Sequence, residues 1–334
     1  MKRAIRQTIV DSTSSQPALL TTENLRAEVG DYLARTRVRF AIQAIGCELL
    51  VPAHRPIRFR QSGVMPIYEE TTTIILSYLI GSFCAQVFFD VGAGVGYFSR
   101  VAASHAWVDT RAHAFEMRPD PLRELRCNIS SDSFADRITV HPAGVTDRHQ
   151  GEIEIWYARG MLFEHRPEPV EYRETWWRRL KFALRGDKSR TLSSTRALVT
   201  SIDHFAKSTS EWPDIIKIDV EGYEGKVLDG AEITLATKQP FVLLELHKDK
   251  KLRFGTRREG IAQRLFDLGY QALFLTDHET RDDCEVVEIG PNHPLLRRQE
   301  TDMILFFHPT RTARRPFRTF PSNNSARAGL SVRT

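Results

Sequence analysis

The sequence predicts an α/β fold built on a doubly wound, mostly parallel seven-stranded sheet, with an α+β extension before it. Three observations lead to this prediction. From residue 87 onward, short apolar segments alternate with segments of helical period, as in a parallel sheet covered by helices on both faces. A glycine-rich turn joins the first of these strands to the first helix. Acidic residues follow the strands, at the sheet edge where open α/β folds bind ligands.

Length and composition place the chain among ordinary globular proteins. It has 334 residues, a formal net charge of +5 and a pI near 9.1. No run of about 18 apolar residues occurs, and the basic N-terminus lacks the apolar core of a signal peptide, so we expect a cytoplasmic protein without a transmembrane segment. The four cysteines lie too far apart for a zinc site or a redox pair, which favours buried, reduced thiols. The basic excess is weak evidence for an anionic partner, and we expect no specific nucleic acid partner.

The first part of the chain is predicted to form a mobile N-terminus, residues 1–20, and then a cap. The terminus is polar and rich in Ser and Thr, as mobile termini are. We expect the extension, residues 21–81, to cover one side of a ligand cleft. Its predicted elements are a helix over 24–38 capped by Thr21 or Thr22, strands over 38–51, and a helix over 67–80 that ends at Gly81.

The stretch from Val87 to Ser99 holds the most informative motif of the chain. A short strand leads into a turn with three glycines at alternate positions, and a helix begins at Tyr97. This geometry brings backbone N–H groups close to a ligand. A nicotinamide dinucleotide fingerprint requires a third glycine where Tyr97 stands, which disfavours a dehydrogenase. The cofactor-binding residues predicted in this stretch are Asp90, Gly92, Gly94, Gly96 and Tyr97.

The pattern Asp-x-Gly-x-Gly-x-Gly resembles the first motif of S-adenosylmethionine-dependent methyltransferases. That cofactor carries no phosphate. It requires close backbone approach and a carboxylate for its cationic amino-acid end, and Asp90 with the glycines provides both. A tight glycine turn that serves only the fold is the alternative.

Two further strands complete the predicted cofactor site. A strand over 111–116 ends in Glu116, about 20 residues beyond the glycines, where an acid accepts hydrogen bonds from a ribose diol. A helix over 119–129 follows, with Pro at its start. The next strand, 138–144, ends at Ala143 and Gly144, which we expect beside the adenine.

Residues 158–197 interrupt the regular alternation, after a strand or hairpin arm over 152–157. Their segment 176–190 places Trp176 and Trp177 among basic residues. Three interpretations remain open: a lid over the substrate, a basic surface in weak contact with a membrane or an anionic partner, and a helix whose tryptophans pack on the body. A single short helix binds membranes weakly without a second anchor, which favours the lid and the packed helix.

Carboxylates gather after the strand over 215–218, and more polar residues end the strand over 241–246. Because parallel strands end at one edge of a sheet, we expect these side chains to lie together. They are Asp219, Glu221, Glu224, Glu245 and His247. The remaining predicted elements are a helix capped by Ser201 or Asp203, a helix over 224–231, a helix over 259–268 ended by Gly269, strands over 271–276 and 303–308, and a disordered basic tail over 309–334.

Methylation of an alcohol benefits from a base within hydrogen-bond reach. Our catalytic candidates are Asp219, Glu221 and His247. We expect the proximity of two like charges to raise the pKa of Asp219 or of Glu221. A metal held by these carboxylates with Glu245 or His247 is an alternative, but acid clusters also cap helices or contact ligands, so we assign no metal ligand.

The motifs together resemble the FkbM family of methyltransferases over roughly residues 68–308. The resemblance implies a Rossmann-like methyltransferase domain over 82–308, S-adenosyl-L-methionine as cofactor, and hydroxyl groups of sugars, polyketides or other small metabolites as acceptors. The chain departs from the family at Gly94, where Asn is usual, and at Met117, where Pro is usual. The residues that carry the resemblance are Tyr68-Glu69, D-V-G-A-G-V-G-Y-F-S at 90–99, F-E at 115–116, T-S-I-D-H-F at 200–205, I-K-I-D-V-E-G-Y-E at 216–224, V-L-D-G-A at 227–231 and L-L-E-L-H at 243–247.

Two classes of function follow from these patterns. The first is a cytoplasmic O-methyltransferase that acts on a sugar, a glycan or a small metabolite. The second is a non-catalytic binding or scaffold protein on a methyltransferase fold, which would use the basic segment and the tail.

Overall fold

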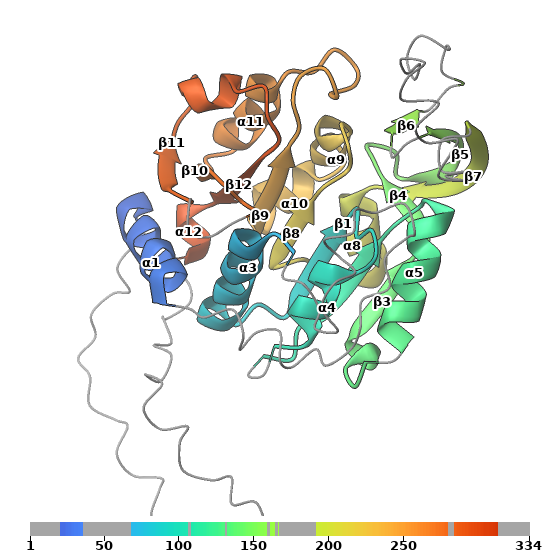
Figure 1. Cartoon of the computed structure of the whole chain (residues 1–334), viewed down its shortest axis with the longest axis horizontal. Coiled ribbons are helices and arrows are strands. Elements are labelled where there is room, and N and C mark those ends of the chain that lie inside the picture. The colour runs from blue at the N-terminus through green and yellow to red at the C-terminus, as the bar shows by residue number, and fades with distance from the viewer. Residues whose placement is uncertain are drawn as a thin grey trace, which may run out of the picture.

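The computed structural model describes residues 21–35, 68–105, 108–130, 132–158, 161–163, 166, 192–279 and 284–312. Its centre is an eight-stranded sheet with the strand order β11-β10-β12-β9-β8-β1-β2-β3 (Figure 1). Strands β9 to β3 in this order are parallel, β12 is antiparallel to both neighbours, and β11 is antiparallel to β10. The strands are β1 (Val87–Val91), β2 (Arg111–Phe115), β3 (Ile138–His141), β8 (Ile215–Ile218), β9 (Phe241–Leu246), β10 (Gln271–Leu275), β11 (Val286–Ile289) and β12 (Asp302–Phe307).

Helices cover both faces of this sheet, as a doubly wound fold requires. One apolar core packs the sheet against α1 (Thr22–Arg35), α3 (Glu70–Phe83), α4 (Tyr97–Ala103) and α5 (Pro119–Ser130). The other packs it against α8 (Ile202–Thr209), α9 (Glu224–Asp229), α10 (Glu232–Thr237) and α11 (Arg258–Asp267). The strands alternate between the two cores: in β1, Phe88 belongs to the first core and Phe89 to the second.

A second, four-stranded sheet has the order β4-β7-β5-β6 and lies beside α5 and α8 in Figure 1. Its strands are β4 (Ala143–Val145), β5 (Gln150–Ala158), β6 (Met161–Phe163) and β7 (Ser193–Thr200). The single strand predicted over 138–144 is therefore wrong. It breaks at Pro142, which has no N–H to donate, and β3 and β4 belong to different sheets. Most of the interruption predicted over 158–197, with its tryptophans, lies outside the described residues.

Several predicted boundaries are confirmed and others are wrong. Thr21 caps α1 by accepting from the N–H of Asn24 at 3.2 Å, and Ser201 caps α8 by accepting from that of His204 at 3.2 Å. Gly81 does not end its helix, because α3 continues to Phe83 and stops at Cys84 in a left-handed conformation. The α/β prediction holds, but the sheet has eight strands rather than seven, since β11 adds a partly exposed edge strand.

Other predictions fall largely outside the described residues. These are the mobile N-terminus, the strands over 38–51 and the basic tail beyond residue 312.

Of the cysteines in the described ranges, all are free, and Cys127 is exposed rather than buried. Within those ranges no helix combines the length and the apolar character needed to cross a membrane.

The buried guanidinium of Arg258 ties the first residue of α11 to the antiparallel part of the sheet. It is 1% exposed and donates to the carbonyls of Leu246, Leu296 and Glu300, as well as to the carboxylate of Asp302. These contacts join α11 to the ends of β9 and β12. A buried charge with this many partners is costly to leave unpaired once one partner is removed.

We therefore expect Arg258→Met to lower the free energy of unfolding by about 3–5 kcal/mol, since it leaves three carbonyls without their donor and the buried Asp302 with only the more distant guanidinium of Arg298, at 3.6 Å. Urea denaturation followed by circular dichroism measures this loss. Adding Asp302→Leu to the same chain should restore part of it. Arg297→Met, which breaks an exposed pair with Glu259, is the control and should cost under about 1 kcal/mol. Equal losses for the two single variants would contradict the assignment.

Candidate functional site

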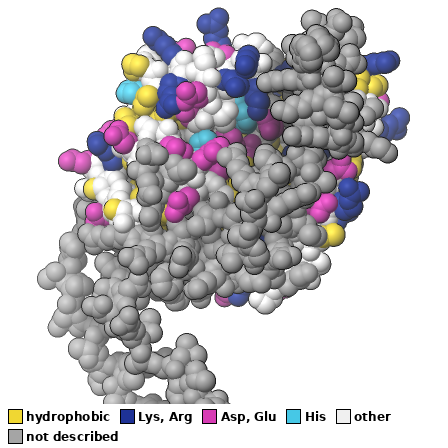
Figure 2. Space-filling view, viewed as in Figure 1, with side chains coloured by type: hydrophobic (Ala, Val, Ile, Leu, Met, Phe, Trp, Pro, Cys, Tyr) yellow, Lys and Arg dark blue, Asp and Glu magenta, His cyan; other side chains and the backbone are white. Residues whose placement is uncertain are grey.

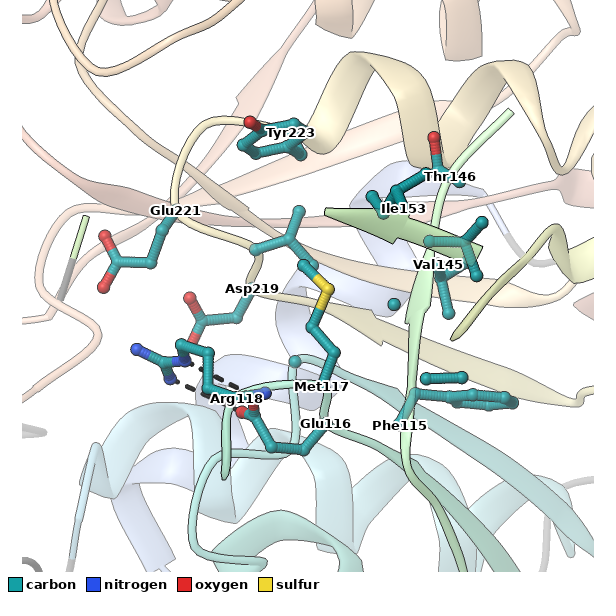
Figure 3. A pocket seen from close by; sticks show the side chains of 15 residues that line it. Phe115, Glu116, Met117, Arg118, Val145, Thr146, Ile153, Asp219, Glu221 and Tyr223 are labelled. Carbon is teal, nitrogen blue, oxygen red and sulfur yellow. Dashed lines mark hydrogen bonds and ion pairs between the residues drawn. The ribbon is translucent and has the colours of Figure 1, made fainter. Parts of the chain in front are cut away.

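A pocket lies at the carboxyl ends of β1, β2 and β8, between the main sheet and the second sheet (Figure 3). Its empty space is about 660 Å³, which includes the part open to solvent. One wall is apolar and carries Phe115, Met117, Val145, Ile153 and Val199, while charged side chains line the other. The polar residues of the lining are Glu116, Arg118, Thr146, Asp219 and Glu221.

The glycine turn after β1 forms the floor of this site through close backbone contacts. Gly92 has φ 85°, and a Cβ there would lie 1.9 Å from the carbonyl oxygen of Asp219, so no other residue fits between β1 and β8. A Cβ on Gly96 would lie 2.3 Å from Leu125, which lets α4 pack closely on α5. A Cβ added to Gly94, at φ 57°, would meet no atom closer than the carbonyl oxygen of Gly92 at 4.0 Å, so this side of the turn faces open space. Of the three predicted glycines, Gly92 lines the pocket.

Glu116, immediately after β2, connects this turn to the pocket. Its carboxylate accepts the N–H of Gly94 at 3.0 Å and that of Arg118 at 2.8 Å, and it pairs with the Arg118 guanidinium at 3.3 Å. Glu116 raises the pKa of Arg118 further above its ordinary value. The acid that the sequence predicts for a ribose diol is thus 4% exposed, lines the pocket and faces the glycine turn.

Asp90 and Tyr97, also predicted to bind the cofactor, lie behind the pocket rather than in its lining. Asp90 accepts the N–H of Ser99 at 2.9 Å and its hydroxyl at 2.6 Å, which ties the end of β1 to α4. Its Oδ1 has no hydrogen-bond donor among the described residues, and burial raises the pKa of Asp90 to about 6. The hydroxyl of Tyr97 accepts from Thr73 of α3, and burial raises the pKa of Tyr97 to about 12.

The second sheet supplies the wall where the adenine is expected. Ala143 and Gly144 of β4 line the pocket, as the sequence predicts. A Cβ on Gly144 would lie 2.5 Å from the sulfur of Met117, which projects between the two walls. Ile153 and Val199 were not predicted. Ile153 comes from β5 and Val199 from β7, and these two strands pair with each other. The sequence did not predict β7.

A buried lysine stands inside β8. Lys217 is 1% exposed, and its ammonium group lies 3.1 Å from Oδ2 of Asp219 and 4.5 Å from the centre of the Phe98 ring. Burial lowers the pKa of Lys217, but Asp219 and nearby carboxylates, including Glu69, raise it to a value above the ordinary one. Lys217 was not predicted as a site residue, although a lysine within an apolar strand is itself a signal.

His247, just after β9, lies among three carboxylates. Its Nδ1 is 2.6 Å from Oε1 of Glu224, and its Nε2 is 3.4 Å from Glu221 and 3.8 Å from Glu245. Burial lowers the pKa of His247, but hydrogen bonds with Glu221 and Glu224 raise it to about 10. The imidazole is therefore cationic near neutral pH, so it is not a ready base in this state.

The carboxylates of the cluster titrate very differently. Burial raises the pKa of Asp219, but the ammonium of Lys217 lowers it to a value below the ordinary one. Burial likewise raises that of Glu221, and the hydrogen bond from His247 brings it down to about 2. The expectation that like charges raise the pKa of Asp219 or Glu221 is therefore wrong. The raised group is Glu245, because of its burial and because Asp219 and Glu69 lie nearby.

The space-filling view shows how the charges divide on this face. In Figure 2, Asp and Glu side chains with His side chains among them gather across the middle, and Lys and Arg side chains lie above them. Asp219 and Glu221 extend into the same side of the pocket in Figure 3, opposite the apolar wall. The geometry provides an apolar slot with the buried Glu116 at its floor. Beside it lies the acid cluster, which contains the cationic Lys217 and His247.

Comparisons with known proteins identify the family of the chain. A family model described as the methyltransferase FkbM domain matches residues 90–272. A comparison of the sequence with curated proteins found no match. Among solved structures, a methyltransferase FkbM from Methylobacillus flagellatus is similar, with 15% identity and a TM-score of 0.40 over 81% of this chain and 59% of that one.

Two other similar structures cover most of their own chains. The first is a precorrin-6y C5,15-methyltransferase from Geobacter metallireducens, with 13% identity and a TM-score of 0.40 over 79% of this chain and 98% of that one. The second is an O-methyltransferase from Bacillus cereus in complex with SAH, with 14% identity and a TM-score of 0.39 over 84% of this chain and 95% of that one. The present chain spans 59% of the length of the Methylobacillus protein. The family model, by contrast, spans more than half of the chain and includes the glycine turn, Glu116 and the acid cluster. The chain belongs to the FkbM-domain methyltransferases.

Proposed function

We propose that the protein transfers a methyl group from S-adenosyl-L-methionine to a hydroxyl oxygen of a sugar, a glycan or a small metabolite. The observation that carries this proposal is the placement of Glu116. The buried carboxylate of Glu116 faces an open glycine turn at the floor of an apolar slot, and Asp219 and Glu221 of the acid cluster line the same pocket.

The residues present fit an adenosyl cofactor. Glu116 would accept hydrogen bonds from the ribose hydroxyls, and the apolar wall of Phe115, Val145 and Val199 would hold the adenine ring. The orphaned Oδ1 of the buried Asp90 suits a cationic group close to the turn.

The empty space of the pocket, about 660 Å³ with its open mouth included, falls in the range of ligand pockets but is narrow. Two flexible side chains occupy the space: the thioether of Met117 projects between the walls, and Arg118 lies on Glu116. Met has three rotatable bonds and adapts readily to a new neighbour. We therefore expect Met117 and Arg118 to turn aside on binding, while the backbone of the turn stays in place.

The bound cofactor supplies a methyl group on a sulfonium, whose departure as a neutral thioether drives the transfer. The new carbon–oxygen bond forms as the carbon–sulfur bond breaks, and the hydroxyl proton must leave the acceptor. Asp219 lines the pocket at the end of β8 and can accept that proton's hydrogen bond. Because its pKa is low, Asp219 first orients the hydroxyl for in-line attack and takes up the proton only as the oxygen becomes methylated and strongly acidic; positioning of this kind contributes several kcal/mol.

Glu116→Gln is expected to weaken binding of S-adenosyl-L-methionine about 10- to 100-fold, because the ribose loses a charge-assisted hydrogen bond. Isothermal titration calorimetry on the full chain measures the change. Glu232→Gln, on the exposed first residue of α10, is the control and should bind as the unmodified chain does. If the Glu116 variant binds as tightly as this control, the carboxylate does not hold the ribose.

Asp219→Asn is expected to reduce methyl transfer about 100- to 10,000-fold while binding of the cofactor changes little, since the amide cannot take up the proton. The assay incubates the protein with a cell extract and isotope-labelled S-adenosyl-L-methionine, and mass spectrometry identifies the compound that gains the label. Asp147→Asn, which removes another acid paired with a lysine, is the matched control. Label on nitrogen or carbon rather than oxygen, or no label with the unmodified chain, would refute the proposed reaction.

A further inference from the structure

A mixed set of metal-ligating side chains gathers at the carboxyl ends of β8 and β9, and one of its members, Asp219, also lines the pocket. Asp219 follows β8, Glu245 is the fifth residue of β9, and His247 follows β9. One ligand atom from each lies within 4.8 Å of those of the other two, so one ion can reach all three after small side-chain movements. Adjacent parallel strands bring them together, and this gives the set a rigid support.

The orientation of His247 is the first argument for a cation. Its Nδ1 is held by the carboxylate of Glu224 at 2.6 Å, and Glu224 is fully buried. This contact leaves Nε2 facing Glu245 and Glu221. A histidine that ligates a metal through one ring nitrogen almost always donates the other ring N–H to a carboxylate, a carbonyl or water.

An excess of buried carboxylate is the second, independent argument. Glu69, at the start of α3, is 5% exposed, and its Oε2 has no hydrogen-bond donor among the described residues. Glu224, whose Oε1 lies 2.6 Å from Nδ1 of His247, is also fully buried, and its Oε2 has no hydrogen-bond donor among the described residues. Buried carboxylates without full compensation are costly, and a divalent cation is the direct remedy.

We propose that Asp219, Glu245 and His247 bind a divalent transition-metal ion of the Mn²⁺, Co²⁺ or Zn²⁺ class, with Glu224 as the carboxylate that orients the histidine. Two oxygen donors and one imidazole suit these ions better than Mg²⁺ or Ca²⁺, which prefer oxygen ligands alone. Three protein ligands leave coordination positions for an acceptor oxygen. Binding of the acceptor oxygen by the ion rests on the proposed methyl transfer, whereas binding of the ion itself does not.

The test uses the full chain freed of metal by EDTA and then dialysed. Mn²⁺ is the probe, and electron paramagnetic resonance counts the free ion during titration. We expect one tight site per chain in the absence of S-adenosyl-L-methionine. Glu245→Gln and His247→Gln should each weaken it at least tenfold, and Glu224→Gln about 10- to 100-fold, through the loss of the orienting carboxylate.

Glu116→Gln is the matched control, because it alters a buried acid of the same pocket that is not a proposed ligand. It should keep its affinity for Mn²⁺ while losing affinity for the adenosyl cofactor, and Glu245→Gln should show the reverse pattern. Cofactor binding by Glu245→Gln also shows that this variant is folded.

The outcomes separate the two proposals. Cofactor binding without a Mn²⁺ site, or a Mn²⁺ site that survives both Glu245→Gln and His247→Gln, overturns the metal assignment and leaves the proposed function standing. A Mn²⁺ site that these variants abolish, in a chain that binds no S-adenosyl-L-methionine, supports the metal site and removes the proposed function.

Discussion

The burial of charge at the carboxyl end of β8 is the constraint on which the site depends. Lys217 is inside an otherwise apolar strand, nearly free of solvent, and its ammonium needs anionic partners at short range. Asp219, two residues on, is the nearest of these. A lysine at this position is stable only while the surrounding carboxylates stay in place, so the same interaction that holds the strand end together keeps the pocket strongly charged.

The two sides of the pocket are built by different kinds of force. Around the glycine turn, backbone contacts decide the shape: Gly92 touches the carbonyl of Asp219, and the N–H groups of Gly92 and Ala93 both donate to the carbonyl of Phe115. On the inner side, ionic contacts decide it, through Lys217, His247 and the acids around them. Steric contacts of the first kind tolerate little change, whereas the ionic side can rearrange when a new cation or a proton arrives.

The sequence predicted the elements around the glycine turn better than the rest because they depend on local patterns. The strand, the glycine turn and Glu116 are read from spacing alone, and the structure brings Gly92 and Glu116 to one pocket. The break at Pro142 and the pairing of β4 with β7 depend on contacts between residues far apart in the chain, which no local pattern reports. The same reason hid the role of Glu224, since its contact with His247 joins two separate strand ends.

Non-local contacts also explain why Glu221 has a fixed place although it follows a strand in a loop. Glu221 has φ 56°, and Gly222 after it has φ 109°, so the chain turns sharply at this point. A Cβ on Gly222 would lie 2.1 Å from the carbonyl of Lys251, and the N–H of Arg253 donates to the carbonyl of Gly222. The loop after β8 is thereby packed against the loop after β9, and Lys251 pairs with Glu221 across the junction. The position of this acid is therefore set by backbone packing between two loops, and the ion pair adds to a geometry that the turn already imposes.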